Sequence, residues 1–311
     1  MSNFIRQNIN IVNGFSKENG WVILNEIEAK IKAKIEIVGL PLKEWDVSIN
    51  YGIKTGFNEA FIIDANKRKE LIKNCPKAAE IIRPILRGRE IHKYQIENNN
   101  QYLLFVPWHF PLNSDEDITG ASMVAEEAFK KEYTAVYEHL SQFKNQLEKR
   151  NQAETGIRYE WYALQRFGSN YWENFNLPKI IYPNMTKYLP FYYDETGHYL
   201  NDKCFMITGN HLSYLMAFLN SSIFKYCFIN NFPELMGGTR ELRKIFFELI
   251  SVKVINDEIN ELFKEKIIKI QAVKNNGGNT TSLEKEIDQM LFNLYDLTFE
   301  ERETIGFIEI T

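Results

Sequence analysis

The chain has 311 residues, of which 44% are hydrophobic and 14% aromatic, so it has ample material for a packed core in one large or two ordinary domains. Lysine and arginine total 37 against 41 acidic residues, and the net charge of −4 argues against a strongly basic nucleic-acid-binding protein. The first residues lack a secretory signal pattern and no apolar run approaches the roughly 18 residues of a membrane span, so we expect a cytoplasmic protein without a membrane partner.

The first predicted element is an amphipathic helix between Trp21 and Gly39, in which isoleucine recurs every fourth residue: Ile23, Ile27, Ile31 and Ile35. Next, Val47 to Tyr51 and Ala60 to Ile63 favour two short strands, because β-rich runs flank a glycine-bearing loop. Lys67 to Asn74 is typical of a helix. This part of the chain therefore predicts a helix, a hairpin-like pair of strands and a second helix.

Pro76 favours the start of another short helix, which we expect to continue through Pro84 and to break at Gly88. The apolar run from Tyr102 to Pro107 predicts a buried strand. The strongest helical pattern in the chain runs from Ser122 to Arg150. Its apolar residues keep a helical period: Phe129, Tyr133, Val136, Tyr137, Leu140, Phe143 and Leu147.

The middle of the chain, from Arg158 to Asn230, alternates aromatic-rich strands with turns and predicts one helix from His211 to Leu219. A longer helix is expected to begin after Asn256 or Asp257, either of which is a good N-cap. The Asn-Gly-Gly sequence at 276–278 stops it.

Two capping signatures follow, Thr281 with Glu284 and Thr298 with Glu301. Each consists of a threonine followed three residues later by a glutamate, the pattern that satisfies free backbone N–H groups at a helix start. The end of the chain therefore predicts a helical hairpin followed by a short helix.

Common catalytic motifs are absent from the sequence. It has no phosphate-binding loop, no GxGxxG, no GxSxG and no HExxH. Glu28-Ala29-Lys30 resembles part of a nuclease core, but no aspartate precedes it as a metal ligand. The Asn-Pro-Pro-aromatic loop that a DNA methyltransferase uses on its flipped base is also missing. We therefore expect no catalytic residue in this chain.

Cysteine and histidine spacing predicts neither a disulfide framework nor a metal site. Cys75, Cys204 and Cys227 lie far apart, as expected of reduced, buried thiols. The five histidines also lack ligand spacing: His92, His109, His139, His198 and His211.

Three predicted loops combine glycine with cationic and polar side chains, which suit a phosphate clamp and a reader of base edges. Their glycines are Gly52, Gly56, Gly88, Gly237 and Gly238. Their candidate DNA-contacting side chains are Lys54, Thr55, Asn58, Arg87, Arg89 and Arg240. Between Lys54 and Lys93, ten cations face five anions.

Each of these features also has a structural interpretation. Glycine loops are mostly turns, and a run of cations is usually a solvated helix face. Four aromatic residues could stack on bases, although most aromatic residues must form the core: Trp161, Tyr162, Tyr171 and Trp172. Composition alone therefore leaves DNA binding open.

The order of short motifs is more specific than composition. Ile49 to Asp64 (INYGIKTGFNEAFIID) and Glu80 to Tyr94 (EIIRPILRGREIHKY) closely resemble the start of the TaqI-like specificity domain at the C-terminal end of type IIG restriction-modification enzymes. Further matches follow in the same order: Trp161 to Gln165, Pro178 to Pro183 and Leu219 to Ser222. Glu286 to Glu301 resembles the terminal LYGLT helix of these enzymes, with Asp296 where glycine is usual. The resemblance spans nearly the whole chain.

The resemblance implies an α+β fold, with a mixed β-sheet target recognition domain, surrounding helices and a C-terminal helical hairpin. It implies three parts: an N-terminal helical linker from a methyltransferase domain (1–40), a DNA target recognition domain (41–251) and a C-terminal helical segment (252–311). The implied partners are double-stranded DNA and a linked adenine-N6 methyltransferase domain, in a prokaryotic cytoplasm. S-adenosylmethionine would bind that other domain, so no cofactor is expected here.

Three alternatives remain at this point. The loop from Gly52 to Asn58 could be structural and hold the domain against the methyltransferase. The chain could be a free-standing specificity subunit, or a protein–protein interaction module whose hairpin, Asn256 to Leu294, docks a partner helix. Charge does not exclude DNA, because Thr281 to Thr311 carries eight acids against two cations, which leaves +2 on the rest of the chain.

Overall fold

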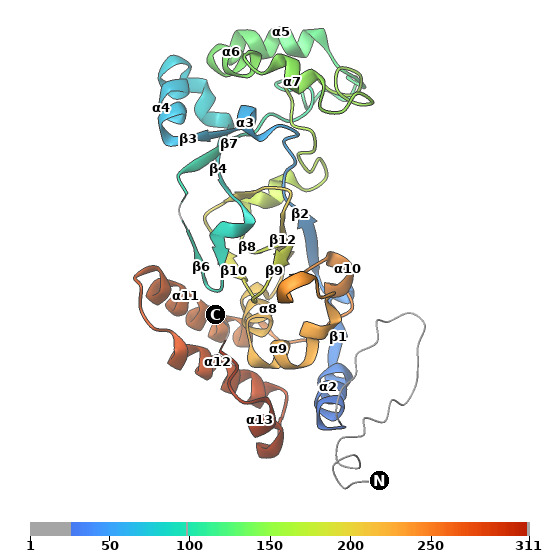
Figure 1. The fold of residues 1–311 in the computed structure, drawn as a ribbon, viewed down its shortest axis with the longest axis vertical. Coiled ribbons are helices and arrows are strands. Elements are labelled where there is room, and N and C mark those ends of the chain that lie inside the picture. Colours follow the sequence, from blue (N-terminus) through green and yellow to red (C-terminus); the bar gives the residue numbers. More distant parts are fainter. Residues whose placement is uncertain (1–25, 98, 310–311) are drawn as a thin grey trace.

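The computed structural model describes residues 26–97 and 99–309. Figure 1 shows an elongated molecule with helices at both ends and β-strands between them. We call the end that carries α3 to α7 the upper lobe, and the end that carries α2 and α8 to α13 the lower lobe. The N-terminal helix predicted between Trp21 and Gly39 is present as α2, while Ile23 lies outside the described residues.

Two four-stranded sheets form the middle of the molecule. The first is antiparallel throughout and has the order β10-β8-β12-β2. Its strands are β2 (Val47–Tyr51), β8 (Lys179–Pro183), β10 (Tyr192–Asp194) and β12 (Cys204–Gly209). The second has the order β11-β4-β7-β3 and is mixed, because β11 runs parallel to β4. Its strands are β3 (Ile62–Asp64), β4 (Ile82–Leu86), β7 (Gln101–Leu104) and β11 (Tyr199–Leu200).

Three two-stranded ribbons complete the strands. They pair β1 (Gly39–Pro41) with β14 (Ser251–Lys253), β5 (Ile91–His92) with β6 (Gln95–Ile96), and β9 (Met185–Thr186) with β13 (Arg240–Glu241). The helices of the upper lobe are α3 (Asn58–Phe61), α4 (Ala65–Asn74), α5 (Met123–Glu132), α6 (Thr134–Ser141) and α7 (Lys144–Glu148). Those of the lower lobe are α2 (Glu26–Val38), α8 (Leu212–Leu219), α9 (Ser222–Phe228), α10 (Lys244–Phe247), α11 (Asp257–Asn275), α12 (Thr281–Leu294) and α13 (Phe299–Ile305). This α+β architecture confirms the expected fold class.

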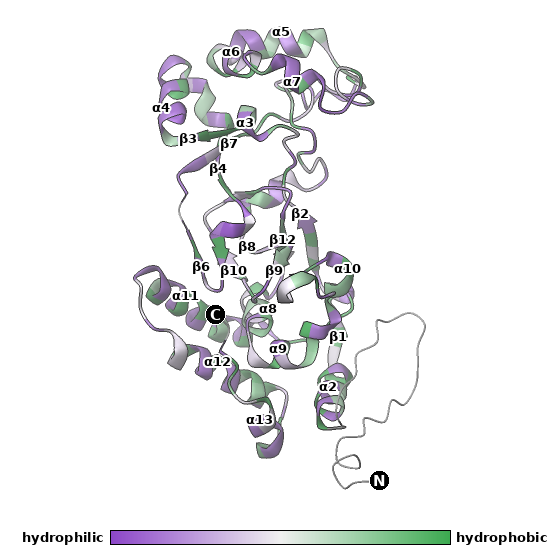
Figure 2. Cartoon of the chain, in the orientation of Figure 1, coloured by the Kyte–Doolittle hydropathy of each residue, from purple (hydrophilic) through white to green (hydrophobic). Residues whose placement is uncertain are grey.

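In the antiparallel sheet β10-β8-β12-β2, strands β8, β10 and β12 are buried on both faces over nearly their whole length, and each face belongs to a different hydrophobic core, whereas the edge strand β2 is exposed at Ser48 and Tyr51. Successive residues of a strand point to opposite faces. Accordingly, Tyr182 and Phe205 lie in the core of the lower lobe, while Ile181 and Met206 lie in the core of the upper lobe. Figure 2 shows the hydrophobic residues concentrated along these strands. The sheet therefore joins the two lobes.

A second connection is the hairpin β5–β6, which extends from the upper strands to the C-terminal helices. Its turn residue Lys93 is buried and forms an ion pair with Glu284 of α12 at 2.5 Å. Gln95 donates a hydrogen bond to the carbonyl of Lys274 at 3.4 Å. The backbone N–H of the neighbouring Tyr94 donates to the carbonyl of Phe191 at 3.1 Å. The hairpin thus attaches the C-terminal helices to the sheet region.

Several sequence predictions of secondary structure are confirmed. The strand Val47 to Tyr51 is β2, and the helices expected at 67–74 and 211–219 are α4 and α8. Asn256 caps α11 by accepting from the backbone N–H of Ile259 at 3.0 Å. Thr298 and Glu301 form the predicted capping box of α13. All three cysteines are free; Cys204 and Cys227 are buried, and Cys75 is half-buried.

Two predictions near the N-terminal strands are confirmed only in part. Of the strand predicted at 60–63, Ile62 and Ile63 belong to β3, whereas Ala60 and Phe61 are fully buried and form the end of the helical turn α3. The helix that starts at Pro76 ends at Ile81, and the following residues form β4. Pairing of β4 with β7, rather than the local helical pattern, decides this segment.

The long helix predicted from Ser122 to Arg150 is wrong, because it is divided into α5, α6 and α7. The first break falls at Tyr133, whose φ and ψ of −125° and 43° are not helical. Its ring lies 4.9 Å from that of Phe110, and the ring of Phe129 lies 5.7 Å from Phe110 on the other side of the break. Packing of both rings on Phe110 therefore takes precedence over a continuous helix.

The capping box predicted for Thr281 and Glu284 does not form. Thr280 occupies the N-cap, and its side chain makes no capping hydrogen bond. Glu284 instead accepts from the hydroxyl of Thr280 at 2.6 Å and pairs with Lys93. The Glu284 side chain thus forms an ion pair with a distant residue in place of the predicted local capping hydrogen bond.

In the described part of the chain, no single helix is long and apolar enough to cross a membrane. Only the pair formed by Leu212–Leu219 and Ser222–Asn231, bent by 64°, reaches that length and hydropathy together.

Arg150, directly after α7, joins three separate segments through its guanidinium group. The group donates to the carbonyls of Leu147 at 3.0 Å and Thr55 at 2.7 Å. It also donates to the carbonyls of Trp161 at 2.6 Å and Ala163 at 2.8 Å. Burial lowers the pKa of Arg150 to about 10, so the group remains charged at neutral pH. Four carbonyl dipoles stabilise this cation in place of a carboxylate.

Lys179 and Asp194 form a fully buried ion pair between neighbouring strands β8 and β10, with 2.7 Å between Nζ and Oδ2. Asp194 also accepts from the hydroxyl of Thr196 at 2.6 Å and the backbone N–H of His198 at 3.0 Å. Burial favours a higher pKa for Asp194, but hydrogen bonds from His198 and the Lys179 ammonium outweigh it and hold the pKa below its usual value. The carboxylate is therefore ionised in the folded protein.

We expect Arg150→Met to destabilise the protein by about 3 kcal/mol, because the buried carbonyls of Thr55, Trp161 and Ala163 lose their donor. Equilibrium unfolding in urea measures this change. Arg158→Met is the matched control, since the Arg158 side chain is 60% exposed, and it should change stability by less than about 0.5 kcal/mol. Equal losses in both variants would contradict the structural role of Arg150.

We expect Asp194→Asn to cost about 3 to 5 kcal/mol, because it leaves the buried ammonium of Lys179 without its counter-charge. The double variant Lys179→Met with Asp194→Leu should be less destabilised than this single variant, since it removes both charges. Unfolding in urea at neutral pH compares them.

The same carboxylate gives the wild type a defined acid dependence. Its folded pKa lies below the unfolded value of about 4, so the stability it adds is complete above about pH 5 and is lost as the pH falls below 4. Asp194→Asn should lack this part of the acid dependence. An identical loss of stability between pH 5 and 3 in wild type and variant would contradict the assignment.

Candidate nucleic-acid interface

The loop after β2, from Gly52 to Asn58, is bound mainly to its own chain. A Cβ atom on Gly52 would lie 2.0 Å from the carbonyl oxygen of Asn201, so only glycine fits there. The backbone N–H groups of Gly52 and Ile53 donate to the carbonyls of Cys204 and Leu200 at 2.9 and 2.7 Å. These groups are therefore not available to hold a phosphate.

The polar side chains of this loop have different surroundings. Thr55 is buried, and its hydroxyl donates to Asn58 Oδ1 at 2.7 Å. Lys54 is half-buried, and its backbone exchanges two hydrogen bonds of 2.9 Å with Arg166. Gly56 has a φ of +81°, and a Cβ there would lie 2.6 Å from the Arg150 side chain. Of the three predicted contact residues, Lys54 and Asn58 reach the surface and Thr55 does not.

The second predicted loop is the segment around Gly88, from Arg87 to Glu90. The buried carboxylate of Glu90 holds it in place. It accepts from the backbone N–H of Arg87 at 2.7 Å and from the Asn99 amide at 2.6 Å. Arg87 Nη2 pairs with the same carboxylate at 3.1 Å, and Arg89 Nε approaches it at 3.3 Å. The Arg87 side chain is mostly covered, whereas that of Arg89 is 73% exposed. Arg89 is therefore the residue of this loop that is directed to solvent.

The third loop is a tight turn that follows α9. Arg240 forms an ion pair with Glu234 at 2.7 Å and donates to the carbonyl of Phe232 at 2.9 Å. Through these contacts the Arg240 guanidinium stabilises the loop, and its side chain is largely covered. Gly237 and Gly238 form the tip, with φ angles of +73° and +76° that favour glycine.

The fold brings the three loops close to further cations that the sequence analysis missed. Gly88 lies against Pro183 and near the backbone of Lys203. The N–H of Asn184 donates to the Lys203 carbonyl at 2.8 Å, and the N–H of Leu242 donates to the Asn184 carbonyl at 2.7 Å. Four elements are thus neighbours: the second loop, the turn that precedes β12, strand β9 and strand β13.

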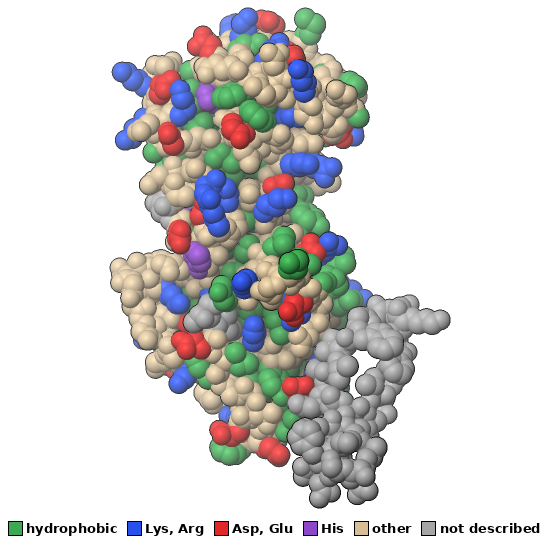
Figure 3. All heavy atoms as spheres, in the orientation of Figure 1, with side chains coloured by type: hydrophobic (Ala, Val, Ile, Leu, Met, Phe, Trp, Pro, Cys, Tyr) green, Lys and Arg blue, Asp and Glu red, His purple; other side chains and the backbone are tan. Residues whose placement is uncertain are grey.

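We define the waist surface by the cations that these elements and the first loop carry: Lys54, Arg89, Arg166, Lys187, Lys203 and Arg243. Figure 3 shows lysine and arginine side chains gathered between the two lobes. Four of the six were not singled out from the sequence, because they are isolated cations on elements far apart along the chain. No local pattern marks them; only the pairing of β9 with β13 and the approach of Gly88 to Pro183 place them together.

Few acidic groups oppose these cations. Lys203 is 74% exposed and lies 3.9 Å from the carboxylate of Asp202. Arg243 pairs with Glu241 at 2.8 Å. Within residues 26–97 and 99–309, Lys54, Arg166 and Lys187 have no carboxylate within ion-pairing distance. The waist surface therefore has a positive character.

The aromatic residues considered for base stacking are mostly structural. Trp161 and Tyr162 are buried in the core of the upper lobe, where Tyr162 stacks on Phe129 at 4.6 Å. Tyr171 and Trp172 are half-buried. Two exposed aromatic rings lie near the waist surface: Tyr51 on β2, which packs on Phe205 at 4.4 Å, and Tyr188, which follows Lys187.

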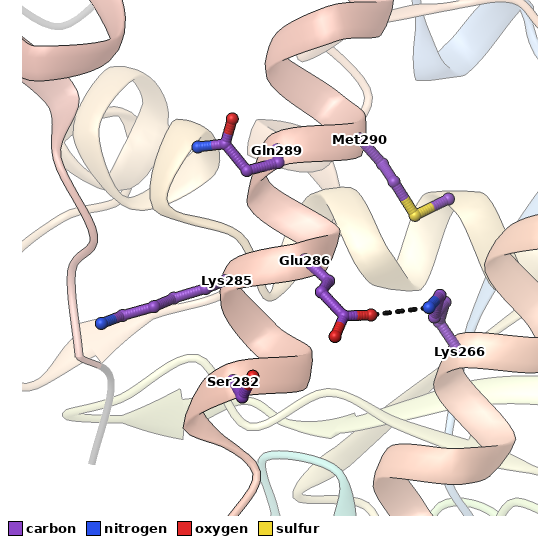
Figure 4. Close-up of a pocket in the computed structure, with 6 residues that line it drawn as sticks. All are labelled: Lys266, Ser282, Lys285, Glu286, Gln289 and Met290. Atoms are coloured by element: carbon purple, nitrogen blue, oxygen red, sulfur yellow. Dashed lines mark hydrogen bonds and ion pairs between the residues drawn. The ribbon is translucent and has the colours of Figure 1, made fainter.

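A groove between α11 and α12 is the other candidate site. Figure 4 shows the ion pair of Lys266 and Glu286, 2.6 Å apart, and the other residues that line the groove, among them Lys285 and Gln289. In the described ranges no three histidine, cysteine or acidic side chains are grouped to hold a metal ion. The predicted apolar face of α11 packs into the lower lobe through Phe263, Ile267 and Ile270. The described residues of the groove therefore include no such cluster, and the apolar face of α11 is buried inside the lower lobe and not open to a partner.

Known proteins resemble this chain in sequence and in fold. The chain is 25% identical over 252 residues to the type II methyltransferase M.MjaIV of Methanocaldococcus jannaschii. The aligned region covers 78% of this chain and 77% of that protein. It also resembles the solved structure of the type IIL restriction-modification enzyme MmeI in complex with DNA, with a TM-score of 0.53 and 12% identity over 86% of this chain. The type IIG restriction endonuclease BpuSI matches 91% of the chain with a TM-score of 0.45 and 15% identity.

The chain spans about a third of the length of these two solved enzymes, 36% and 34% respectively. The likeness to MmeI shows a shared fold. A family model, described as the TaqI-like C-terminal specificity domain, matches residues 83–250, which is more than half of the chain. The matched region includes the Glu90 loop, the antiparallel strands β8, β10 and β12, and the loop braced by Arg240. The chain therefore belongs to the TaqI-like C-terminal specificity domain family.

Proposed function

We propose that this chain recognises a specific sequence in double-stranded DNA through the waist surface. The observation that carries the proposal is the group of exposed cations on that surface, in a chain of the specificity-domain family. Phosphate groups contribute most of the affinity of such complexes, and contacts to base edges contribute the specificity. The waist surface offers side chains suited to both tasks.

Arg89 is the best candidate for a base contact. Its Nε faces Glu90, and its exposed guanidinium extends from a short, well-fixed loop. A planar guanidinium held in this way suits bidentate pairing with guanine O6 and N7 in the major groove. The lysines at 54, 187 and 203 are point charges on flexible stems, which suit phosphate contacts without sequence preference.

Of the residues predicted from the sequence, we retain Lys54, Asn58 and Arg89 as DNA contacts. Thr55, Arg87 and Arg240 act in this proposal as positioning residues, since each is held by a contact within the chain. In this proposal the five loop glycines have a structural role.

We further propose that recognition positions a linked adenine-N6 methyltransferase, and that this chain performs no catalysis. The absence of an Asn-Pro-Pro-aromatic motif from its sequence supports this division of labour. The relative named as a type II methyltransferase and the solved restriction-modification enzymes support the kind of system. S-adenosylmethionine would then bind the methyltransferase, in the cytoplasm of a prokaryotic cell.

We expect Arg89→Ala to weaken binding to the preferred duplex by about 1 to 3 kcal/mol and to relax sequence preference at one base pair. The preferred duplex is first selected from a randomised pool with the full chain, and affinities are then measured by fluorescence anisotropy. Arg158→Ala is the matched control, because Arg158 is also an exposed arginine beside a glutamate but is not one of the cations of the waist surface. Equal effects of the two variants would contradict the assignment of Arg89.

We expect Lys203→Ala to weaken binding to all duplexes alike and to lower the salt dependence of the logarithm of the affinity by about one unit. Titrations over a range of sodium chloride concentrations measure this slope. If the affinity for DNA does not depend on salt concentration, or if the chain binds no DNA even at low salt, an interaction module with a protein partner is favoured over DNA recognition. A methyltransferase reading frame fused to this one would distinguish the linked arrangement from a free-standing specificity subunit.

A further inference from the structure

The most exposed large hydrophobic side chain of the described residues is Met236, at 96%. It lies at the tip of the tight turn from Leu235 to Thr239, which we call the methionine tip. The backbone N–H of Leu235 donates to the carbonyl of Thr239 at 2.7 Å and closes the turn. Gly237 and Gly238 have positive φ angles, and a Cβ on Gly238 would have no heavy atom within 4 Å. The tip therefore projects from the surface without packing on it.

The base of the methionine tip is firmly held. Glu234 and Arg240 form an isolated β-bridge and also an ion pair at 2.7 Å. Arg240 donates as well to Phe232, whose ring is buried in the lower core, and to Asn230. A rigid base costs little conformational entropy when the tip contacts a ligand.

The surroundings of the tip are apolar and cationic. Met185 of β9, opposite Glu241, and Tyr188 are both exposed. Lys187 is exposed, and its Nζ would lie 4.0 Å from a Cβ on Gly237. The nearby carboxylates of Glu234 and Glu241 are paired with Arg240 and Arg243. A polyanion can therefore approach the tip without meeting an unpaired carboxylate among these groups.

The methionine tip is also continuous with the waist surface. Strand β13 follows the tip directly and pairs with β9, and Leu242 is linked through Asn184 to Lys203. A duplex that contacts Lys187 and Lys203 by its phosphates would bring a groove to the tip. Proteins that bend DNA insert single apolar side chains, including methionine, between base steps.

We propose that Met236 enters a groove of the bound duplex and wedges between two neighbouring base pairs, so that the DNA bends at that step. This inference rests on the proposed function, since it names how the same surface deforms its DNA. Leucine should replace methionine in this role, because it presents an apolar side chain of similar size, whereas alanine is too short to separate stacked bases.

The first experiment measures DNA bending by energy transfer between dyes at the two ends of the selected duplex, with the full-length chain. We expect Met236→Ala to abolish most of the bend and to weaken binding on the order of tenfold. Met236→Leu should keep both properties. Met123→Ala is the matched control, because Met123 is 83% exposed on α5 of the upper lobe, and it should change neither. Unfolding midpoints verify that all variants are folded.

The second experiment replaces Met236 or Met123 with a photoreactive diazirine amino acid and irradiates the complex with the duplex. We expect a covalent adduct to DNA from position 236 and none from position 123. Duplex binding that depends on Arg89, together with an unchanged bend in Met236→Ala and no adduct from position 236, would overturn the wedge and leave the proposed function intact. Absence of any duplex binding would overturn both. An adduct from position 236 to a protein partner instead of DNA would assign the tip to a protein interface and also overturn the wedge.

Discussion

The structure depends on a four-stranded antiparallel sheet whose strands β8, β10 and β12 are covered by a hydrophobic core on each face. A strand covered on both faces must supply apolar residues at successive positions, as the fully buried sequence Lys179 to Pro183 does, whereas the edge strand β2 alternates and leaves Ser48 and Tyr51 exposed. The one charged residue in that strand, Lys179, is tolerated because Asp194 on the adjacent strand neutralises it. The lobes on either side are built onto this layer. Two segments of the waist surface, the loop after β2 and the turn before β12, leave from its strand ends, while the Arg89 loop follows β4 of the mixed sheet.

The sequence predicted the parts of the fold that local signals determine. The Asn256 cap and the Thr298 capping box were confirmed because a cap requires only residues three apart along the chain. Predictions failed where distant partners decided the outcome: Phe110 for the break at Tyr133, β7 for the strand β4, and Lys93 for the side chain of Glu284. The division into parts at 1–40, 41–251 and 252–311 stays a prediction.

The candidate site was predictable only in part, for the same reason. A loop rich in glycine and cations was identified from the sequence, but its pattern could not separate Arg89, which faces solvent, from Arg87, which is held by Glu90. That distinction depends on the burial of one carboxylate, to which the distant Asn99 also contributes. Lys187 and Lys203 could not be found at all, since each is a single cation brought to the surface by strand pairing.

Because one sheet contributes side chains to two hydrophobic cores, there are limits on how this domain can be modified. Cutting the chain between the lobes would expose an apolar sheet face, with Tyr182 and Phe205 on one side or Ile181 and Met206 on the other. Neither half would be a stable unit for exchange between relatives. The exposed side chains of the waist surface, such as Arg89 and Lys203, by contrast lie outside both cores. New DNA specificities should therefore be built by grafting loops onto an intact sheet, and not by recombining lobes.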